Sequence, residues 1–169
     1  MKYFKIVVVA VFALVALSAA TVDNSPKPLG EKVLNALKKD DVETYRSYYI
    51  TPAELKMELK QAVKQPFQMV DDDELIDDYT GKFDNAGKMA FTRIRKEGEN
   101  KGIAWEKAEF DYIQVPVVTV VKEVSQADVF IHFKYDGKAH IIKLKDCMHT
   151  PKRGWCLFGE VRFEKVPNQ

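Results

Sequence analysis

The spacing of apolar residues changes character near Gly102 and divides the chain into two parts. Before Gly102, apolar residues recur every three or four positions, which is typical of amphipathic helices. After it, aromatic and β-branched residues alternate with polar ones, which is typical of strands. Helices followed by strands predict an α+β fold, with N-terminal helices packed on one face of a curved antiparallel sheet of about five strands.

Five stretches of the first part have helical periodicity. They span residues 29–39, 42–49, 51–64, 71–80 and 84–99. The third has the clearest start, because Thr51 supplies a capping hydroxyl, Pro52 takes the first helical position and Glu54 completes a capping box. We expect Gly81 to interrupt the helical pattern, and the glycines at 98 and 102 to end the last helix.

The predicted strands span residues 104–114, 117–124, 128–135, 138–146 and 155–164. Asp136-Gly137 favours a two-residue hairpin turn that pairs Tyr135 with Lys138. The same register pairs Phe133 with His140, Ile131 with Ile142 and Val129 with Leu144, and it places all six on one apolar face of the sheet. In the first strand, alternation places Ala108, Phe110 and Tyr112 on the core side.

The N-terminus has the pattern of an export signal. Lys2 and Lys5 precede an unbroken apolar run over residues 6–17, and small residues follow at 18–20. We therefore expect a signal peptide over residues 1–20, a linker over 21–28 and a single α+β domain over 29–169. The apolar run is too short to span a membrane, so the expected product is secreted or periplasmic without a stable membrane anchor.

Cys147 and Cys156 flank a short turn-rich stretch. In an oxidising compartment a lone cysteine pair favours a disulfide, here across a hairpin. That bond sets Ile142 opposite Val161 and His140 opposite Phe163, and it brings Lys143 beside Glu160 on the other face.

Charge narrows the classes of partner. Without Lys2 and Lys5, the 26 basic residues fall to 24 against 25 acidic ones. A nearly neutral chain lacks the basic surplus that nucleic acids and anionic membranes require, so we expect no nucleic-acid partner. The expected partner is a small apolar molecule or a protein.

His140 is the strongest candidate for chemistry, because the register places it among apolar side chains. An imidazole beside a cavity can act as a general acid or base, although such a histidine is more often a satisfied core residue. Tyr48, Tyr112 and Phe133 complete the predicted ligand-binding set. No carboxylate partner, nucleophile elbow, phosphate-binding glycine loop or Cys-x-x-Cys motif accompanies them, so no catalytic residue is assigned.

Two groups of residues contain potential metal ligands but lack a complete site. The acidic residues 71–78 lack the glycine and terminal glutamate of a calcium loop and suit a helix N-terminus. Cys147, His149 and Cys156 lack a fourth zinc ligand and a common zinc spacing. The sequence predicts no metal and no cofactor.

Two segments resemble a known family. Residues 33–45 (VLNALKKDDVETY) are similar to the first helix pair of nuclear-transport-factor-two-like domains. Residues 152–157 (KRGWCL) resemble the terminal hairpin of secreted members. The resemblance implies a cone, in which a bent sheet wraps around helices and leaves a cavity at its open end. A cystatin-like arrangement of helix on sheet is the alternative.

Together these patterns predict an exported, non-catalytic domain that binds a small apolar ligand or a protein partner. Two alternatives stay open. One is a small-molecule isomerase or dehydratase that uses His140. The other is an inhibitor or immunity-type protein that acts through an exposed strand edge.

Overall fold

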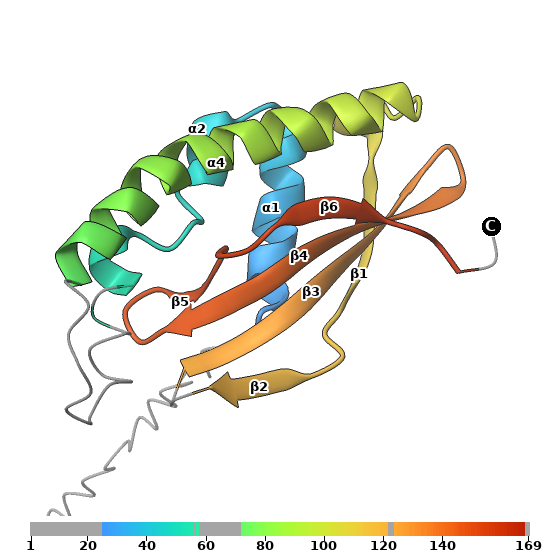
Figure 1. Cartoon of the computed structure of the whole chain (residues 1–169). Helices are drawn as coiled ribbons and strands as arrows, with labels where there is room; N and C mark the ends of the chain where they lie inside the picture. The colour runs from blue at the N-terminus through green and yellow to red at the C-terminus, as the bar shows by residue number, and fades with distance from the viewer. Residues whose placement is uncertain (1–24, 56, 58–71, 122–123, 168–169) are drawn as a thin grey trace, which may run out of the picture.

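The helices and strands of the computed structural model follow the predicted order (Figure 1). The structure describes residues 25–55, 57, 72–121 and 124–167, and for residues 72–85 and 121 it describes the backbone alone. The helices are α1 (Lys27–Lys39), α2 (Val42–Arg46), α4 (Asp72–Asn100) and the short 3₁₀ helix η1 (Trp105–Lys107). The strands are β1 (Glu109–Gln114), β2 (Val118–Val121), β3 (Val124–Tyr135), β4 (Lys138–Thr150), β5 (Gly154–Cys156) and β6 (Val161–Glu164).

Over the described residues, the six strands form one antiparallel sheet in the order β1-β3-β4-β5. β2 pairs with the part of β3 that β1 leaves free, and β6 pairs with the part of β4 that β5 leaves free. The predicted strand over 155–164 is therefore two strands, β5 and β6. This split accounts for six strands where about five were expected.

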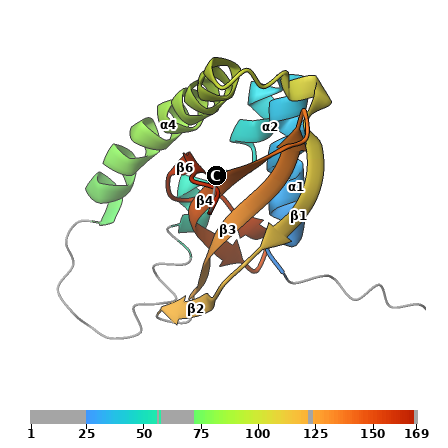
Figure 2. The same ribbon diagram turned by 90° about the vertical axis from the view of Figure 1, so that its right-hand side faces the viewer.

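The α+β class is confirmed, because helices pack on one face of a curved sheet (Figures 1 and 2). We call this face the core face; it carries Val129, Ile131 and Phe133 of β3, each at most 1% exposed. α1 packs on β1 and β3 through its buried apolar side, while α4 lies beside β6 and α2. Burial of these apolar side chains is the main force that holds the layers together.

The predicted hairpin between β3 and β4 is confirmed. Asp136 and Gly137 both have positive φ, 50° and 71°, as the tight turn requires, and Tyr135 pairs with Lys138. The predicted pairs follow in register, namely Phe133 with His140, Ile131 with Ile142 and Val129 with Leu144.

The predicted capping box at the third helix is also confirmed. The backbone N–H and the hydroxyl of Thr51 donate to Glu54 Oε2 at 2.8 and 2.7 Å, and the Glu54 N–H donates back to Thr51 Oγ1 at 3.3 Å. Residues 52–55 are helical. The predicted end of this helix near residue 64 lies outside the described residues.

The predicted break at Gly81 is wrong, because α4 is one continuous helix from Asp72 to Asn100. A single glycine inside a helix costs only about 1 kcal/mol relative to alanine, which is too little to break a helix of 29 residues. The helix ends as predicted near Gly102, whose φ of 76° suits a glycine. Residues 72–78 of the acidic run fall at the start of this helix. The side chains of the run lie outside the described residues.

The first predicted strand begins later than expected. Residues 105–107 form η1, which buries the Trp105 ring in the core, and its indole N–H donates to the Arg95 carbonyl at 3.0 Å. β1 then begins at Glu109, and its pairing with β3 shifts between Phe110 and Tyr112. This irregularity turns Tyr112 to the outer face of the sheet, so the prediction that it shares the core side with Ala108 is wrong.

The predicted disulfide is also wrong, since Cys147 and Cys156 are both buried and not bonded. Cys156 pairs across the sheet with Met148, the residue after Cys147. Neighbouring residues of a strand point to opposite faces, so the two sulfur atoms lie on opposite faces. Cys147 belongs to the main core, and Cys156 to a small cluster with Ile50, Leu55, Val124 and Met148.

A bulge in β4 sets the face that Cys147 occupies. Val129 pairs with Leu144, but Ala127 pairs with Cys147, so Lys145 and Asp146 together oppose Asp128. The extra residue sends Cys147 to the core face beside Leu144. The register that the disulfide implied between β4 and β6 is also wrong: Phe163 lies opposite Ile142, Val161 opposite Leu144 and Arg162, not Glu160, opposite Lys143.

Candidate functional site

His140 and Phe133, two of the predicted ligand-binding residues, lie together on neighbouring strands. Their rings stack with centroids 5.3 Å apart, Phe133 is buried and His140 is half-buried. Burial, with the nearby charges of Lys101 and Lys138, lowers the pKa of His140. The imidazole is therefore neutral at neutral pH and packs as an aromatic ring.

The predicted partners of His140 lie elsewhere. Tyr112 is 48% exposed on the outer face, where its ring stacks on His132 at 4.1 Å. Tyr48 is partly buried against the main core, and its carbonyl accepts a hydrogen bond from the Leu157 N–H at 2.8 Å. The structure thus brings His140 and Phe133 together and separates both tyrosines from them.

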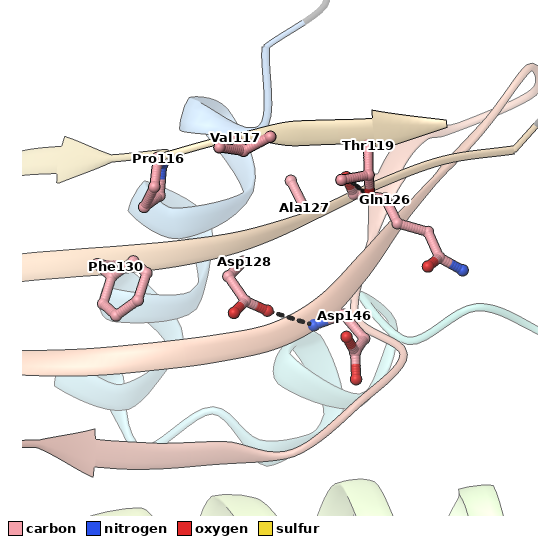
Figure 3. Close-up of a pocket in the computed structure, with 8 residues that line it drawn as sticks. All are labelled: Pro116, Val117, Thr119, Gln126, Ala127, Asp128, Phe130 and Asp146. Atoms are coloured by element: carbon pink, nitrogen blue, oxygen red, sulfur yellow. Dashed lines mark hydrogen bonds between the residues drawn. The ribbon is translucent and has the colours of Figure 1, made fainter. Parts of the chain in front are cut away.

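A pocket of about 290 Å³ lies on the outer face, over the bulge, and Figure 3 shows its lining residues. Its lining residues are Pro116, Val117, Thr119, Gln126, Ala127, Asp128, Phe130 and Asp146. Asp128 accepts from the Asp146 N–H at 3.0 Å and lies 2.6 Å from Lys143 Nζ, and that ammonium group lies 5.1 Å from the Phe130 ring centre. The charges of Asp128 and Lys143 thus neutralise each other, and their contacts stabilise the bulge. We therefore interpret the residues of this pocket as structural.

Among the described residues, two larger hollows adjoin at the N-terminal end of α1, where the core face of the sheet extends past the helix. The first, which we call the apolar lobe, has a volume of about 450 Å³. Apolar side chains form most of its wall, and the full lining is Ser25, Pro26, Lys27, Ile113, Val115, Val118, Ser125, His149 and Trp155.

The second hollow, which we call the basic lobe, has a volume of about 520 Å³. Its lining residues are Ser25, Pro28, Leu29, Lys32, His149, Pro151, Lys152, Arg153, Gly154 and Trp155. Ser25, His149 and Trp155 line both lobes. The His149 and Trp155 rings meet edge to face, 5.6 Å apart, so this aromatic pair marks the junction between the lobes.

The apolar lobe depends on a close approach of α1 to the sheet. Gly30 of α1 is buried, and a Cβ atom there would lie 2.5 Å from Cδ1 of Ile113. Glycine therefore lets the helix approach Ile113 closely, and Ile113 becomes one wall of the lobe.

Arg153 fixes the turn that carries the basic lobe. Its Nε lies 2.6 Å from Glu54 Oε1, and its two terminal nitrogens donate to the carbonyls of Ser47 and Tyr49 at 2.7 and 2.6 Å. Burial alone raises the pKa of the Glu54 carboxyl, but hydrogen bonds from Thr51 and the charge of Arg153 hold that pKa below its usual value. The ionised carboxylate thus ties the β4–β5 turn to the segment after α2.

Sequence reasoning missed the aromatic pair at the junction. It considered His149 only as a zinc ligand, but His149 shares the core face with Cys147 whereas Cys156 points to the other face. The period-two spacing of Cys147 and His149 already indicated a shared face. The contribution of α1 to the hollow has no comparable local signal.

The two lobes offer binding surface: the aromatic junction supplies ring faces and edges, and the lysines supply positive charge. No helix among the described residues is long and apolar enough to cross a membrane. Comparisons of the chain with protein families, curated proteins and solved structures gave no match.

Proposed function

We propose that this protein is a non-catalytic binding domain that holds a small, largely apolar molecule in the apolar lobe. The observation that carries the proposal is the hollow itself, which lies on the core face, is walled by Ile113 and Val118, and ends at the His149–Trp155 pair. Ligand sites are typically concave and mostly apolar with a few polar groups, and have volumes of roughly 300–1,000 Å³.

The exposure of apolar side chains on β2 supports an apolar ligand. Val118 and Val120 of β2 are 48% and 67% exposed, and paired positions along β2 and β3 place Val118 on the same face as Ala127 and Cys147. Apolar side chains left open to water beside a hollow gain free energy when a ligand covers them.

Trp155 makes the test direct. The chain has two tryptophans; Trp105 is 2% exposed in the core, whereas Trp155 lines the hollow. We expect titration with octanol to change tryptophan emission and to release or absorb heat in calorimetry. Trp155→Phe should remove most of the emission change while calorimetry still detects binding.

Two valines provide a matched pair of variants. Val118→Asp places a carboxylate in the apolar lobe and should weaken octanol binding by about tenfold or more, because burying a charge against apolar surface is costly. Val117→Asp makes the same change at a residue of the outer pocket and should leave binding unchanged. Equal loss in both variants would refute the proposal, and so would a native protein that binds neither octanol nor octanoate, the corresponding carboxylate.

We propose further that the domain acts outside the cytoplasm, because the N-terminal residues have the order of charge, apolar run and small residues of an export signal. Intact mass of the protein purified from its own host tests this. Cleavage near residue 20 is the expected result, and a chain that retains residues 1–20 would contradict it.

A further inference from the structure

We infer, on the basis of the proposed function, that the ligand is an amphipathic anion whose apolar tail lies in the apolar lobe and whose carboxylate lies in the basic lobe. The lobes differ in chemistry but adjoin through Ser25, His149 and Trp155. One molecule can therefore reach both.

All charged side chains that line the basic lobe are positive. Its lining includes Lys32, Lys152 and Arg153 and no aspartate or glutamate. Arg153 is already committed to Glu54 and two backbone carbonyls. Within the part of the chain that the structure describes, neither lysine takes part in an ion pair.

The two lysines come from different parts of the fold. Lys32 belongs to α1, and Lys152 to the turn between β4 and β5, which Arg153 fixes to the segment after α2. Both side chains are exposed, so their ammonium groups remain hydrated until an anion arrives. A lysine ammonium is a compact point charge on a flexible stem, which suits a carboxylate of variable position.

The apolar lobe limits the charge to one end of the ligand. The one lysine in its lining, Lys27, is exposed at the first position of α1. Ile113, Val115 and Val118 offer no partner for an anion, and a carboxylate placed among these three would lose its hydration without compensation. The arrangement therefore selects a molecule with one anionic head and one apolar tail over a neutral molecule or a compact anion.

Three probes of related structure test the inference at neutral pH and low salt: octanoate, octanol and acetate. We expect octanoate to bind on the order of fivefold tighter than octanol, because its carboxylate can form two partly exposed ion pairs and each such pair contributes little free energy. Added salt should reduce that preference through screening. Acetate, which has the head without the tail, should bind far more weakly than octanoate.

A double variant assigns the preference to the two lysines. Lys32→Gln with Lys152→Gln should make octanoate and octanol bind equally, while octanol affinity stays as in the native protein. Lys138→Gln, in the exposed β3–β4 hairpin, is the matched control and should keep the preference.

The outcomes separate this inference from the proposed function. Equal affinity of the native protein for octanoate and octanol would refute the inference that the ligand has an anionic head, but it would not affect the proposed binding function. A preference that survives in the double variant, or acetate binding as tight as octanoate, would also overturn it. Failure of both octanol and octanoate to bind would overturn the proposed function itself.

Discussion

Asp128 holds the β4 bulge through Asp146: its Oδ1 accepts a hydrogen bond of 3.0 Å from the Asp146 N–H, at a residue whose φ is 52°. Its Oδ2 lies 2.6 Å from Lys143 Nζ. One carboxylate thereby stabilises a backbone conformation that an L-residue rarely adopts. The bulge in turn decides which face Cys147 occupies.

Replacing Asp128 should therefore destabilise the protein. We expect Asp128→Ala to lower the free energy of unfolding by about 1–2 kcal/mol, because a backbone N–H and a lysine lose their acceptor. Asp111→Ala is the control; it removes an exposed pair with Lys134 and should cost less than about 0.5 kcal/mol. Urea denaturation measures both, and equal costs would argue against a special role for Asp128.

The same carboxylate makes stability depend on pH. Burial raises the pKa of Asp128, but hydrogen bonds from Lys143 and the Asp146 N–H outweigh it and hold the pKa below its ordinary value. A lowered folded-state pKa contributes stability above the unfolded value of about 3.9, and this stability is lost as pH falls toward the folded-state pKa. The difference in unfolding free energy between native protein and Asp128→Asn should thus shrink below about pH 4. A difference that stays constant from pH 7 to pH 3 would contradict this.

The pair of Arg153 and Glu54 should matter more than surface pairs. Glu54 is 6% exposed, and lysine cannot reproduce the three contacts of the Arg153 guanidinium. We expect Arg153→Lys to lower the free energy of unfolding by about 1–3 kcal/mol. This is less than the cost of breaking a fully buried ion pair, because Arg153 is partly exposed. Arg162→Lys, which alters exposed pairs with Glu160 and Glu164, should change it by less than about 0.5 kcal/mol. Chemical denaturation distinguishes them, and similar effects would refute the anchoring role.

Gly98 should not accept a side chain. A Cβ atom there would lie 2.3 Å from Cζ2 of the buried Trp105 ring. Gly98→Ala should therefore cost about 1–3 kcal/mol through overpacking, despite the better helix propensity of alanine. Gly87→Ala in the same helix meets the Tyr49 ring at 3.3 Å and should change stability by less than about 1 kcal/mol. Thermal unfolding of both variants tests this, and a Gly98→Ala protein as stable as the native one would disprove it.

Both cysteines should be free but slow to react. Burial raises the pKa of both thiols, so little reactive thiolate forms in the folded protein at neutral pH. Alkylation in denaturant without a reducing agent should add two labels to the intact mass, and native protein should be labelled much more slowly. A mass that gains labels only after reduction would instead show a disulfide.

Local sequence was enough to predict several elements. The Asp136-Gly137 turn, the register that follows from it and the Thr51–Glu54 capping box depend on residues a few positions apart. Their conformational preferences exist before the chain is packed, so they can be read from the sequence. The order of helices and strands likewise follows from periodicity, because each amphipathic segment must bury its apolar side.

Tertiary structure decided what depends on distant partners. The bulge at Asp146 needs Asp128 from another strand, and one extra residue there moved Cys147 to the core face. The pairing of β5 with β4 placed Cys156 opposite Met148, on the other face. The hollow likewise requires α1 to approach Ile113 at Gly30 while Trp155 lines the junction with the basic lobe. Side chains alternate between the two faces of a strand, so one inserted residue reverses the face of every residue after it. A bulge that depends on a distant residue therefore cannot be predicted from the local pattern, and neither can the faces of the residues that follow it.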